Sequence, residues 1–186
     1  PRVADRFRAS HEERLVNEAG VAVGFREFDL DERLRRADQR DEYFPLAYLS
    51  NPEVDDLLGL DLGADPQYRT VLERARDENL TVASEPFLLP GHRGAGSLVL
   101  IAKPVYLMEV ERRQVAERRQ YLRGFVALLL RVATSIETAV NEQPGAAVDV
   151  QLVDRSAGRA AQPIYISPRG TELVRAPVMP CAEQRL

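Results

Sequence analysis

The sequence is poor in the residues that most catalytic and metal sites use. Its 186 residues include one cysteine, Cys181, and two histidines, His11 and His92, that lie far apart in the chain. A single cysteine cannot form an internal disulfide, and no Cys/His spacing typical of zinc sites occurs. The Gly-x-Ser-x-Gly elbow is absent, and two histidines give little support to a Ser/His/Asp triad. We therefore expect no catalytic residue, no metal and no cofactor in this chain.

The sequence also has no long apolar run. Its longest uninterrupted apolar stretch, Phe125 to Leu130, is far below the ~20 residues that a membrane helix needs. No signal peptide precedes the first elements, and the chain starts at Pro1 in the middle of a helical pattern. We expect the sequence to be a piece of a longer protein.

An excess of positive charge is missing as well. The chain has 29 acidic and 25 basic residues, which gives a net charge of −4, and both signs are spread along it. Nucleic-acid binding needs a clustered basic surface, so we expect no nucleic-acid partner. Hydrophobic residues at 45% and charged residues at 29% are ordinary for a globular protein of one large or two small domains.

The first third of the chain predicts a helix, a strand and a charged connector. Apolar positions at four-residue spacing predict a helix over Val3 to Glu18, closed by Gly20, with His11 on its buried stripe. We interpret His11 as a hydrogen-bonded core or interface residue. Val21 to Phe28 has strand composition, and Asp29 to Glu42 reads as a solvated connector or short helix.

The strongest helix signal begins at Asp65. Asp65 can cap the helix and Pro66 suits its first position. An apolar stripe at i, i+3, i+4 and i+7 then predicts a core-facing side, formed by Tyr68, Val71, Leu72 and Ala75. We expect the neighbouring Asp55, Asp56 and Asp61 to be solvated rather than to bind a metal.

Two antiparallel strands follow, at Glu85–Leu89 and Ser97–Tyr106, with a glycine-rich turn between them. The turn lacks the strand–loop–helix context of a phosphate-binding loop, so the hairpin interpretation is preferred. Alternation along the second strand predicts one inward face, made of Leu98, Leu100, Ala102, Pro104 and Tyr106.

The last third predicts a strand that runs directly into a helix. The strand covers "YLRGFVALLL", and the helix has a stripe of Leu129, Val132, Ala133, Ile136 and Val140. Turn composition marks Asn141 to Ala147, and two short strands are expected at Val148–Val153 and Gln162–Ser167. The predicted class is therefore α+β, with antiparallel strands and helices packed on one side.

Several separated motifs arrive in an order that resembles the CHASE domain. They are Asn51-Pro52, Leu58-Gly59-Leu60-Asp61, Ala75-Arg76, Glu85-Pro86-Phe87-Leu88-Leu89, Pro104-Val105-Tyr106 and Gly124-Phe125. Arg8 and Glu12 also stand at matching places in the first helix. The likeness covers roughly residues 1 to 140, and the CHASE domain is the extracytoplasmic sensory module of membrane-bound histidine kinases, nucleotide cyclases and diguanylate cyclases.

The resemblance implies a long N-terminal helix that carries two PAS-like antiparallel-sheet units. On this basis we assign residues 1–20 to the truncated stalk or dimer helix and residues 21–127 to the membrane-distal, ligand-binding unit. Residues 128–186 are assigned to the membrane-proximal unit. The likeness further implies a membrane-anchored, homodimeric receptor in which this part lies outside the cytoplasm.

The positions that hold adenine in the plant cytokinin receptors of this family differ here. By alignment of the motifs, the adenine-binding aspartate corresponds to Tyr68, a threonine to Ala102 and a leucine to Pro90. We therefore do not expect an adenine-type cytokinin as ligand. The expected pocket is more apolar, and the residues placed around it are Tyr68, Leu72, Phe87, Leu89, Leu100, Ala102 and Tyr106.

Three hypotheses follow. The first is a non-enzymatic sensor that binds a small organic molecule and passes the signal to a cytoplasmic kinase or cyclase. The second is a protein-interaction or dimerisation module of the same receptor class without a small-molecule ligand, in which the seven residues are simply core. The third, an unrelated hydrolase or transferase, would require a cleft with paired carboxylates or a metal.

Overall fold

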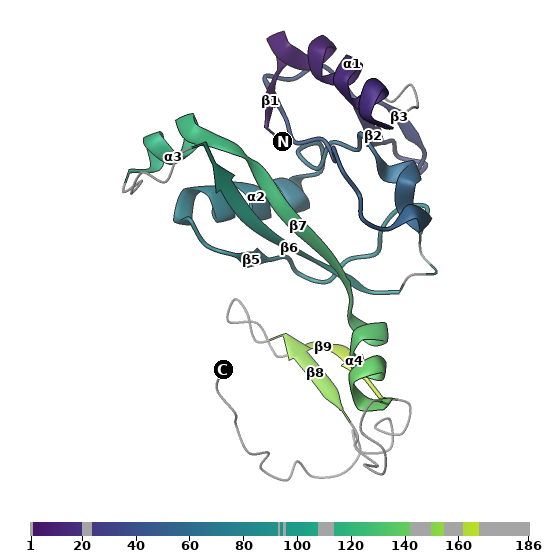
Figure 1. Cartoon of the computed structure of the whole chain (residues 1–186). Coiled ribbons are helices and arrows are strands. Elements are labelled where there is room, and N and C mark those ends of the chain that lie inside the picture. Colours follow the sequence, from purple (N-terminus) through teal and green to yellow (C-terminus); the bar gives the residue numbers. More distant parts are fainter. Residues whose placement is uncertain are drawn as a thin grey trace. The chain divides into compact units, whose positions relative to one another are not determined.

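The computed structural model describes residues 2–19, 24–92, 94, 96–107, 114–141, 150–154 and 162–167 (Figure 1). The chain divides into two compact units, Pro1–Leu130 and Arg131–Leu186. Helices and antiparallel sheets occur together, which confirms the predicted α+β class. The assignment of a stalk helix and two PAS-like units, with boundaries at residues 20 and 127, stays a prediction.

The first unit contains most of the described elements. Its helices are α1 (Arg8–Ala19), α2 (Pro66–Glu78) and α3 (Val115–Tyr121), with 3₁₀-helices η1 (Asp5–Phe7) and η2 (Pro52–Leu57). Its short strands are β1 (Val3–Ala4), β2 (Arg26–Phe28), β3 (Leu34–Arg36), β4 (Glu42–Tyr43) and β5 (Val82–Ala83). Its long strands are β6 (Leu98–Tyr106) and β7 (Leu122–Arg131), which reaches the boundary of the second unit.

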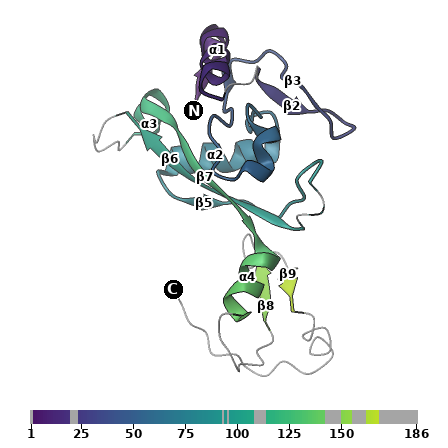
Figure 2. The same cartoon turned by 45° about the vertical axis from the view of Figure 1, so that its right-hand side comes forward.

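A three-stranded sheet in the order β5-β6-β7 forms the centre of the first unit. Helix α2 packs along one face of this sheet, against β5 and β6 (Figures 1 and 2). The predicted alternation along β6 is confirmed, because Leu98, Leu100, Ala102 and Pro104 are buried while the residues between them are more exposed. The inner face of β6 and the apolar stripe of α2 therefore meet and enclose the main core.

Helix α2 has the ends and the buried stripe that the sequence predicts. The Asp65 side chain accepts a hydrogen bond from the Gln67 amide at 2.7 Å, and Pro66 is the first helical residue. Asn79 ends the helix in the left-handed conformation, with φ at 56°. The four apolar stripe residues are all buried, so this face of α2 is fully used in packing.

The predicted strand Glu85–Leu89 is wrong as a regular strand. Only Phe87 pairs there with β6, through two backbone hydrogen bonds with Leu98 of 2.8 and 2.9 Å. The regular pairing is made by β5, two residues long, opposite Ala102 and Ile101. Between these two points Pro86 has no amide to donate, and the Ser84 hydroxyl accepts from the Leu100 amide at 2.9 Å. Proline thus interrupts the ladder, and the segment from Ser84 to Leu89 follows β6 irregularly.

The predicted helix Val3–Glu18 is partly wrong at its start. Val3 is fully buried in β1, where it pairs with Tyr43 of β4, and the α-helix begins only at Arg8. A β-branched valine favours this strand position, where its side chain packs against a small second core. Gly20, the expected end of the helix, lies outside the described residues.

The segment Asp29–Glu42, expected as a solvated connector or short helix, is largely exposed but forms short strands rather than a helix. Strand β3 pairs antiparallel with β2, and β4 pairs with β1. The charged side chains here form ion pairs across elements rather than facing water alone. The sequence does not reveal these two short strands, because their charged residues break the alternation of apolar and polar residues. Charged residues are nevertheless stable at such positions when they pair across strands.

The second unit contains α4 (Val132–Asn141), β8 (Gln151–Asp154) and β9 (Gln162–Ile166). The predicted passage from strand directly into helix is confirmed, with Leu129 in β7 rather than in the helix. Strands β8 and β9 pair antiparallel, as expected for the two predicted strands. The turn at residues 142–147 and the C-terminal part from Arg175, with Cys181, lie outside the described residues.

Candidate functional site

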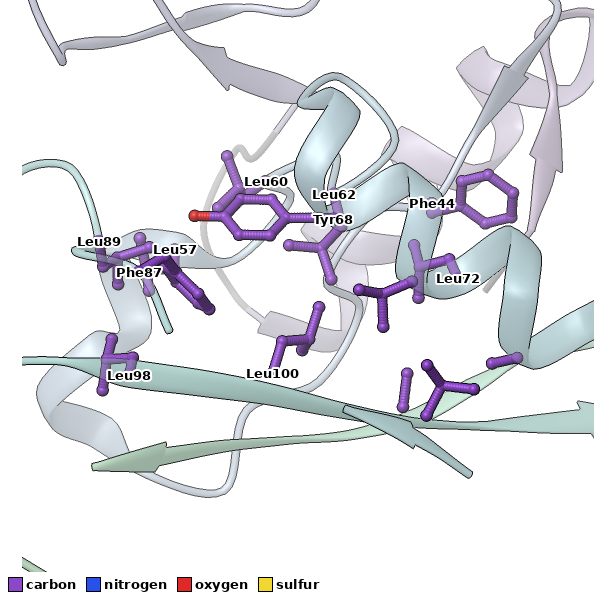
Figure 3. Packing of buried hydrophobic residues seen from close by; sticks show 14 of the residues in the cluster. Phe44, Leu57, Leu60, Leu62, Tyr68, Leu72, Phe87, Leu89, Leu98 and Leu100 are labelled. Atoms are coloured by element: carbon purple, nitrogen blue, oxygen red, sulfur yellow. The ribbon is translucent and has the colours of Figure 1, made fainter. Parts of the chain in front are cut away.

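The seven predicted ligand contacts come together in one cluster of side chains. Tyr68 and Leu72 come from α2, and Phe87 and Leu89 from the irregular segment (Figure 3). Leu100, Ala102 and Tyr106 come from β6. Six of them belong to the main core, with exposed fractions between 0% and 8%. The seventh, Tyr106, is partly buried and packs against the same core. Whether they contact a ligand stays a prediction.

Local structure explains why these residues converge. Tyr68 and Leu72 are four residues apart on α2 and therefore lie on one face of the helix. Leu100 and Ala102 are two residues apart on β6 and therefore lie on one face of the sheet. The contact between α2 and β6 brings these two faces together, and Phe87 joins them through its pairing with Leu98.

The sequence analysis did not place three leucines in this cluster. Leu57 ends η2, and Leu60 and Leu62 lie in the loop between η2 and α2; all three are buried in the main core. For Leu60 and Leu62 the alternation of apolar and other residues in "GLDLG" was the available signal, whereas Leu57, directly beside Leu58, is not part of that alternation. The cluster is therefore built from four parts of the chain: the α2 face, the β6 face, the segment before β6, and η2 with the loop that follows it.

Of the six fully buried residues of the cluster, Tyr68 is the one with a polar group. Its ring meets the Phe87 ring edge to face, with 4.9 Å between centroids and an interplanar angle of 64°. Its hydroxyl end points towards the side where Leu57, Phe87 and Leu89 lie, away from Phe44 and Leu72 (Figure 3). Burial raises the pKa of Tyr68, and the nearby Asp65 carboxylate adds to this effect. The phenol therefore stays protonated and can act as a hydrogen-bond donor.

Tyr106 has a structural partner. Its hydroxyl donates to the carbonyl oxygen of Arg76 at 2.8 Å, near the C-terminal end of α2. This bond satisfies one of the carbonyl groups that a helix end leaves without a partner. Tyr106 thus fastens the end of β6 to the end of α2, beside the cluster.

The charged groups of α2 are paired with one another or with neighbouring elements. Arg69 and Glu73 form an i,i+4 pair at 3.1 Å on the helix surface. Arg76 is buried, and its guanidinium lies 2.7 Å from Asp77 and 3.8 Å from Glu42. The buried members of the main core themselves carry no ionisable group other than the Tyr68 phenol. The surroundings of the seven residues are accordingly apolar and of low dielectric constant.

In the part of the chain that the structure describes, no group of three or more His, Cys, Asp or Glu side chains is arranged to hold a metal ion. None of the helices in this part combines the length and the apolar character needed to span a membrane.

Comparison with known families then identifies the chain. The model of the CHASE domain family matches residues 1–165, most of the sequence. The chain belongs to the CHASE domain family. CHASE domains are extracytoplasmic sensor modules of membrane receptors and are not catalytic domains. A search of curated proteins found no match.

Two motif residues of this CHASE domain form a clamp on its first helix. Arg8 donates to Glu12 at 2.9 Å, to the carbonyl oxygen of Ala37 at 3.0 Å and to the Tyr43 hydroxyl at 3.1 Å. Glu12 in turn accepts from the Phe25 amide at 2.9 Å. Burial alone would raise the pKa of Glu12, but the Phe25 amide and Arg8 outweigh it and lower the pKa. The clamp joins α1 to the body of the first unit.

Asp61, a further motif residue of the CHASE domain, is not solvated as expected. It is 1% exposed and accepts hydrogen bonds from the amides of Phe44 at 2.6 Å and Gly63 at 3.0 Å. Its other oxygen pairs with Arg40 at 2.8 Å. The structure assigns Asp61 an organising role for the loop that leads into α2, which sequence analysis missed.

Proposed function

We propose that this CHASE domain is a receptor sensor that binds a small organic ligand within the cluster of seven residues. Family membership supports the sensor role, and the convergence of the seven residues from α2, β6 and the segment before β6 supports the site. The full-length receptor would be membrane-anchored and homodimeric, with a cytoplasmic kinase or cyclase as its output.

A ligand in this cluster has to separate side chains that now touch. The Tyr68–Phe87 ring contact holds the irregular segment against α2, and Phe87 is paired with the central strand. A molecule inserted between these rings would move the segment relative to α2 and would thereby change the surroundings of β6. Such a ligand shifts the equilibrium between the two arrangements of the domain, with and without the moved segment, only as far as its affinities for these arrangements differ.

A thermal-shift screen of the 186-residue chain against purines, amino acids, organic acids, fatty acids and neutral aromatics tests the proposal. A ligand at about 100 times its dissociation constant stabilises the protein by about 2.7 kcal/mol, which raises Tm by several degrees. We expect Ala102→Val to abolish the shift, since Ala102 lies on the inner face of β6. The matched control Lys103→Ala, at the next and outward-facing position, should bind normally.

Circular dichroism establishes that both variants are folded, and Phe87→Leu serves as a second cluster variant. A ligand whose binding is unaffected by Ala102→Val and by Phe87→Leu contradicts the proposed site. A complete screen without any shift contradicts small-molecule sensing.

One observation favours the second candidate, an interaction module without a small-molecule ligand. The sheet face opposite α2 exposes apolar side chains: Val105 is 41% exposed, Val126 67% and Leu128 54%. Exposed apolar patches are often protein–protein interfaces, and these side chains would contribute to one. If two copies of the chain associate through this face, Val126→Lys lowers the dimer fraction in sedimentation velocity. An unchanged sedimentation profile contradicts this candidate.

A further inference from the structure

Strand β7 forms an outer edge of the central sheet. The strand order β5-β6-β7 gives it a neighbouring strand on one side, β6, and leaves its other side unpaired in the described sheet. Along this outer edge, within the described part of the chain, a single backbone hydrogen bond is made, from the Arg2 amide to the Arg123 carbonyl oxygen at 3.2 Å. The outward backbone groups from Gly124 to Leu130 are therefore available to a partner strand.

The middle of β7 is exposed on both of its faces. Val126 is 67% exposed and Leu128 54%, and both lie on the outer face of the sheet. Ala127 between them is exposed too, although strand alternation directs it to the opposite face. Phe125 and Leu129 pack against the main core and hold the strand in place. The strand is thus ordered by the core, while its middle and its edge stay open.

The edge also lacks two features that commonly protect such strands. From Phe125 to Leu130 it contains no proline and no charged residue, and β7 as a whole is ten residues long. The nearest charges in the sequence are Arg123 and Arg131, one at either end of the run. A long apolar edge of this kind is a template for pairing with another strand.

The sequence of the edge favours a second copy of the chain as the partner. If two copies of β7 pair antiparallel about Ala127, Val126 lies opposite Leu128 of the second copy, and Phe125 opposite its Leu129. Residues opposite each other share a face of the joined sheet, so outer residues meet outer residues and inner residues meet inner residues. The pairing is two-fold symmetric and uses both edges, whereas a foreign strand would leave its own outer edge open.

We propose that two copies of the domain pair antiparallel through the outer edges of β7, centred on Ala127, and so join their central sheets into one. This inference rests on the homodimeric receptor proposed above, for which it specifies the contact, and it holds with or without a small-molecule ligand. Because Arg2 already occupies the Arg123 carbonyl oxygen, the ladder between the copies covers Gly124 to Leu130. Since β7 continues directly into α4, the contact lies where the first unit ends.

Disulfide crosslinking tests the position of the contact. In the 186-residue chain, Cys181→Ser removes the natural cysteine and Ala127→Cys introduces a new one. In the proposed register the two Cα atoms at position 127 lie about 4.5–5.5 Å apart, within the range for a disulfide, so oxidised glutathione should give a covalent dimer. Lys103→Cys in the same background is the matched control, exposed on β6. Three strand spacings, at least about 14 Å, would separate its two copies, so it should stay monomeric.

Charge substitutions test the register. Leu128→Lys and Val126→Glu each place a charge opposite an apolar residue, and each should raise the dimer dissociation constant in sedimentation velocity about tenfold. Combining the two substitutions should restore most of the affinity, because each new lysine then lies opposite a new glutamate. Val105→Lys, at a position of β6 that is 41% exposed, is the control and should leave the dissociation constant unchanged.

The outcomes separate this inference from the proposed functions. A dimer that Val105→Lys weakens as much as Leu128→Lys, with no crosslink at position 127, overturns edge pairing while association through the outer sheet face remains. A double variant as weak as the single variants overturns the register centred on Ala127. A chain that stays monomeric and forms no crosslink at position 127 overturns both the inference and association of two copies, whereas small-molecule sensing is decided separately by the thermal-shift screen.

Discussion

Asp61 shows at the scale of one residue how a buried charge organises a loop. Its carboxylate holds the amides of Phe44 and Gly63 and pairs with Arg40, which also pairs with the buried Glu27. Residues 40–44 and 61–63 are thus joined through one side chain, and Arg40 extends the connection to Glu27 of β2. A carboxylate with this many donors is tolerated in the interior, whereas its partners would be left unsatisfied without it.

Replacing Asp61 should therefore be costly. We expect Asp61→Ala to lower the free energy of unfolding by about 3 kcal/mol, because Arg40 and two amides lose their buried acceptor. Urea denaturation measures the loss. Asp55→Ala, at an exposed aspartate in the same region, should stay within about 0.5 kcal/mol of wild type. A loss at Asp61 as small as at Asp55 would contradict the organising role.

Gly63 is required by the same loop. A Cβ atom there would lie 2.8 Å from Cδ2 of Phe44 and 3.1 Å from Oδ1 of Asp61. We expect Gly63→Ala to destabilise the protein by about 1–3 kcal/mol, since a buried ring has to move. Gly94→Ala is the matched control, because nothing lies within 4 Å of its added Cβ. Equal denaturation midpoints for the two variants would show that the loop adapts freely.

At the scale of elements, β7 is the strand whose faces the sequence does not reveal. Its central run "FVALLL" is apolar at every position, so alternation carries no signal. In the structure Leu122 belongs to the core, and further along Phe125 and Leu129 pack against it. The residues of β7 that face the core are therefore even-numbered up to Gly124 and odd-numbered from Phe125 onwards. Val126 and Leu128 accordingly lie on the outer face.

Adjacent substitutions in β7 test this assignment. The Phe125 ring meets the Phe44 ring at 5.7 Å between centroids, so we expect Phe125→Ala to cost about 2–3 kcal/mol. Val126→Ala, on the exposed side, should change stability by less than about 0.5 kcal/mol. Chemical denaturation of both variants gives the comparison, and a reversed order would mean that the faces are exchanged.

Helix α2 and strand β6 behave in the opposite way. Their apolar positions recur at helical and strand periods with charged or polar residues between them, so the sequence predicts both buried faces correctly. The segment before β6 was predicted less well. There Pro86 interrupts the ladder, and a serine hydroxyl replaces a backbone acceptor, which composition alone does not indicate.

At the scale of the whole molecule, ion pairs connect elements that are far apart in the sequence. The Arg8–Glu12 clamp reaches the Phe25 amide and the Ala37 carbonyl, and the Arg119–Asp77 pair joins α3 to α2 at 2.5 Å. The hydrogen bond from Arg119 lowers the pKa of Asp77, and Arg76 adds to this effect. Stability should consequently depend on pH in the acidic range.

Glu12 provides the test of this dependence. Its pKa is lower in the folded chain than in the unfolded chain, so its contribution is present above the unfolded value and is lost as pH falls through the folded value. We expect Glu12→Gln to be less stable than wild type near pH 7, with a gap that closes below about pH 4. Denaturation at a series of pH values measures it, with the exposed Glu13→Gln as control. A gap that is independent of pH would contradict the role of the carboxylate.

The sequence by itself determined the α+β class, the family, the ends and buried face of α2, and the inner face of β6. These features follow from local periodicity and capping, which depend on residues a few positions apart. Tertiary structure alone decided that Asp61 is buried, that β7 changes its inward side and that the Tyr68 ring packs edge to face against Phe87. The reason is physical: the burial of a charge or a hydroxyl depends on groups that reach it from other elements, such as Arg40, 21 residues from Asp61.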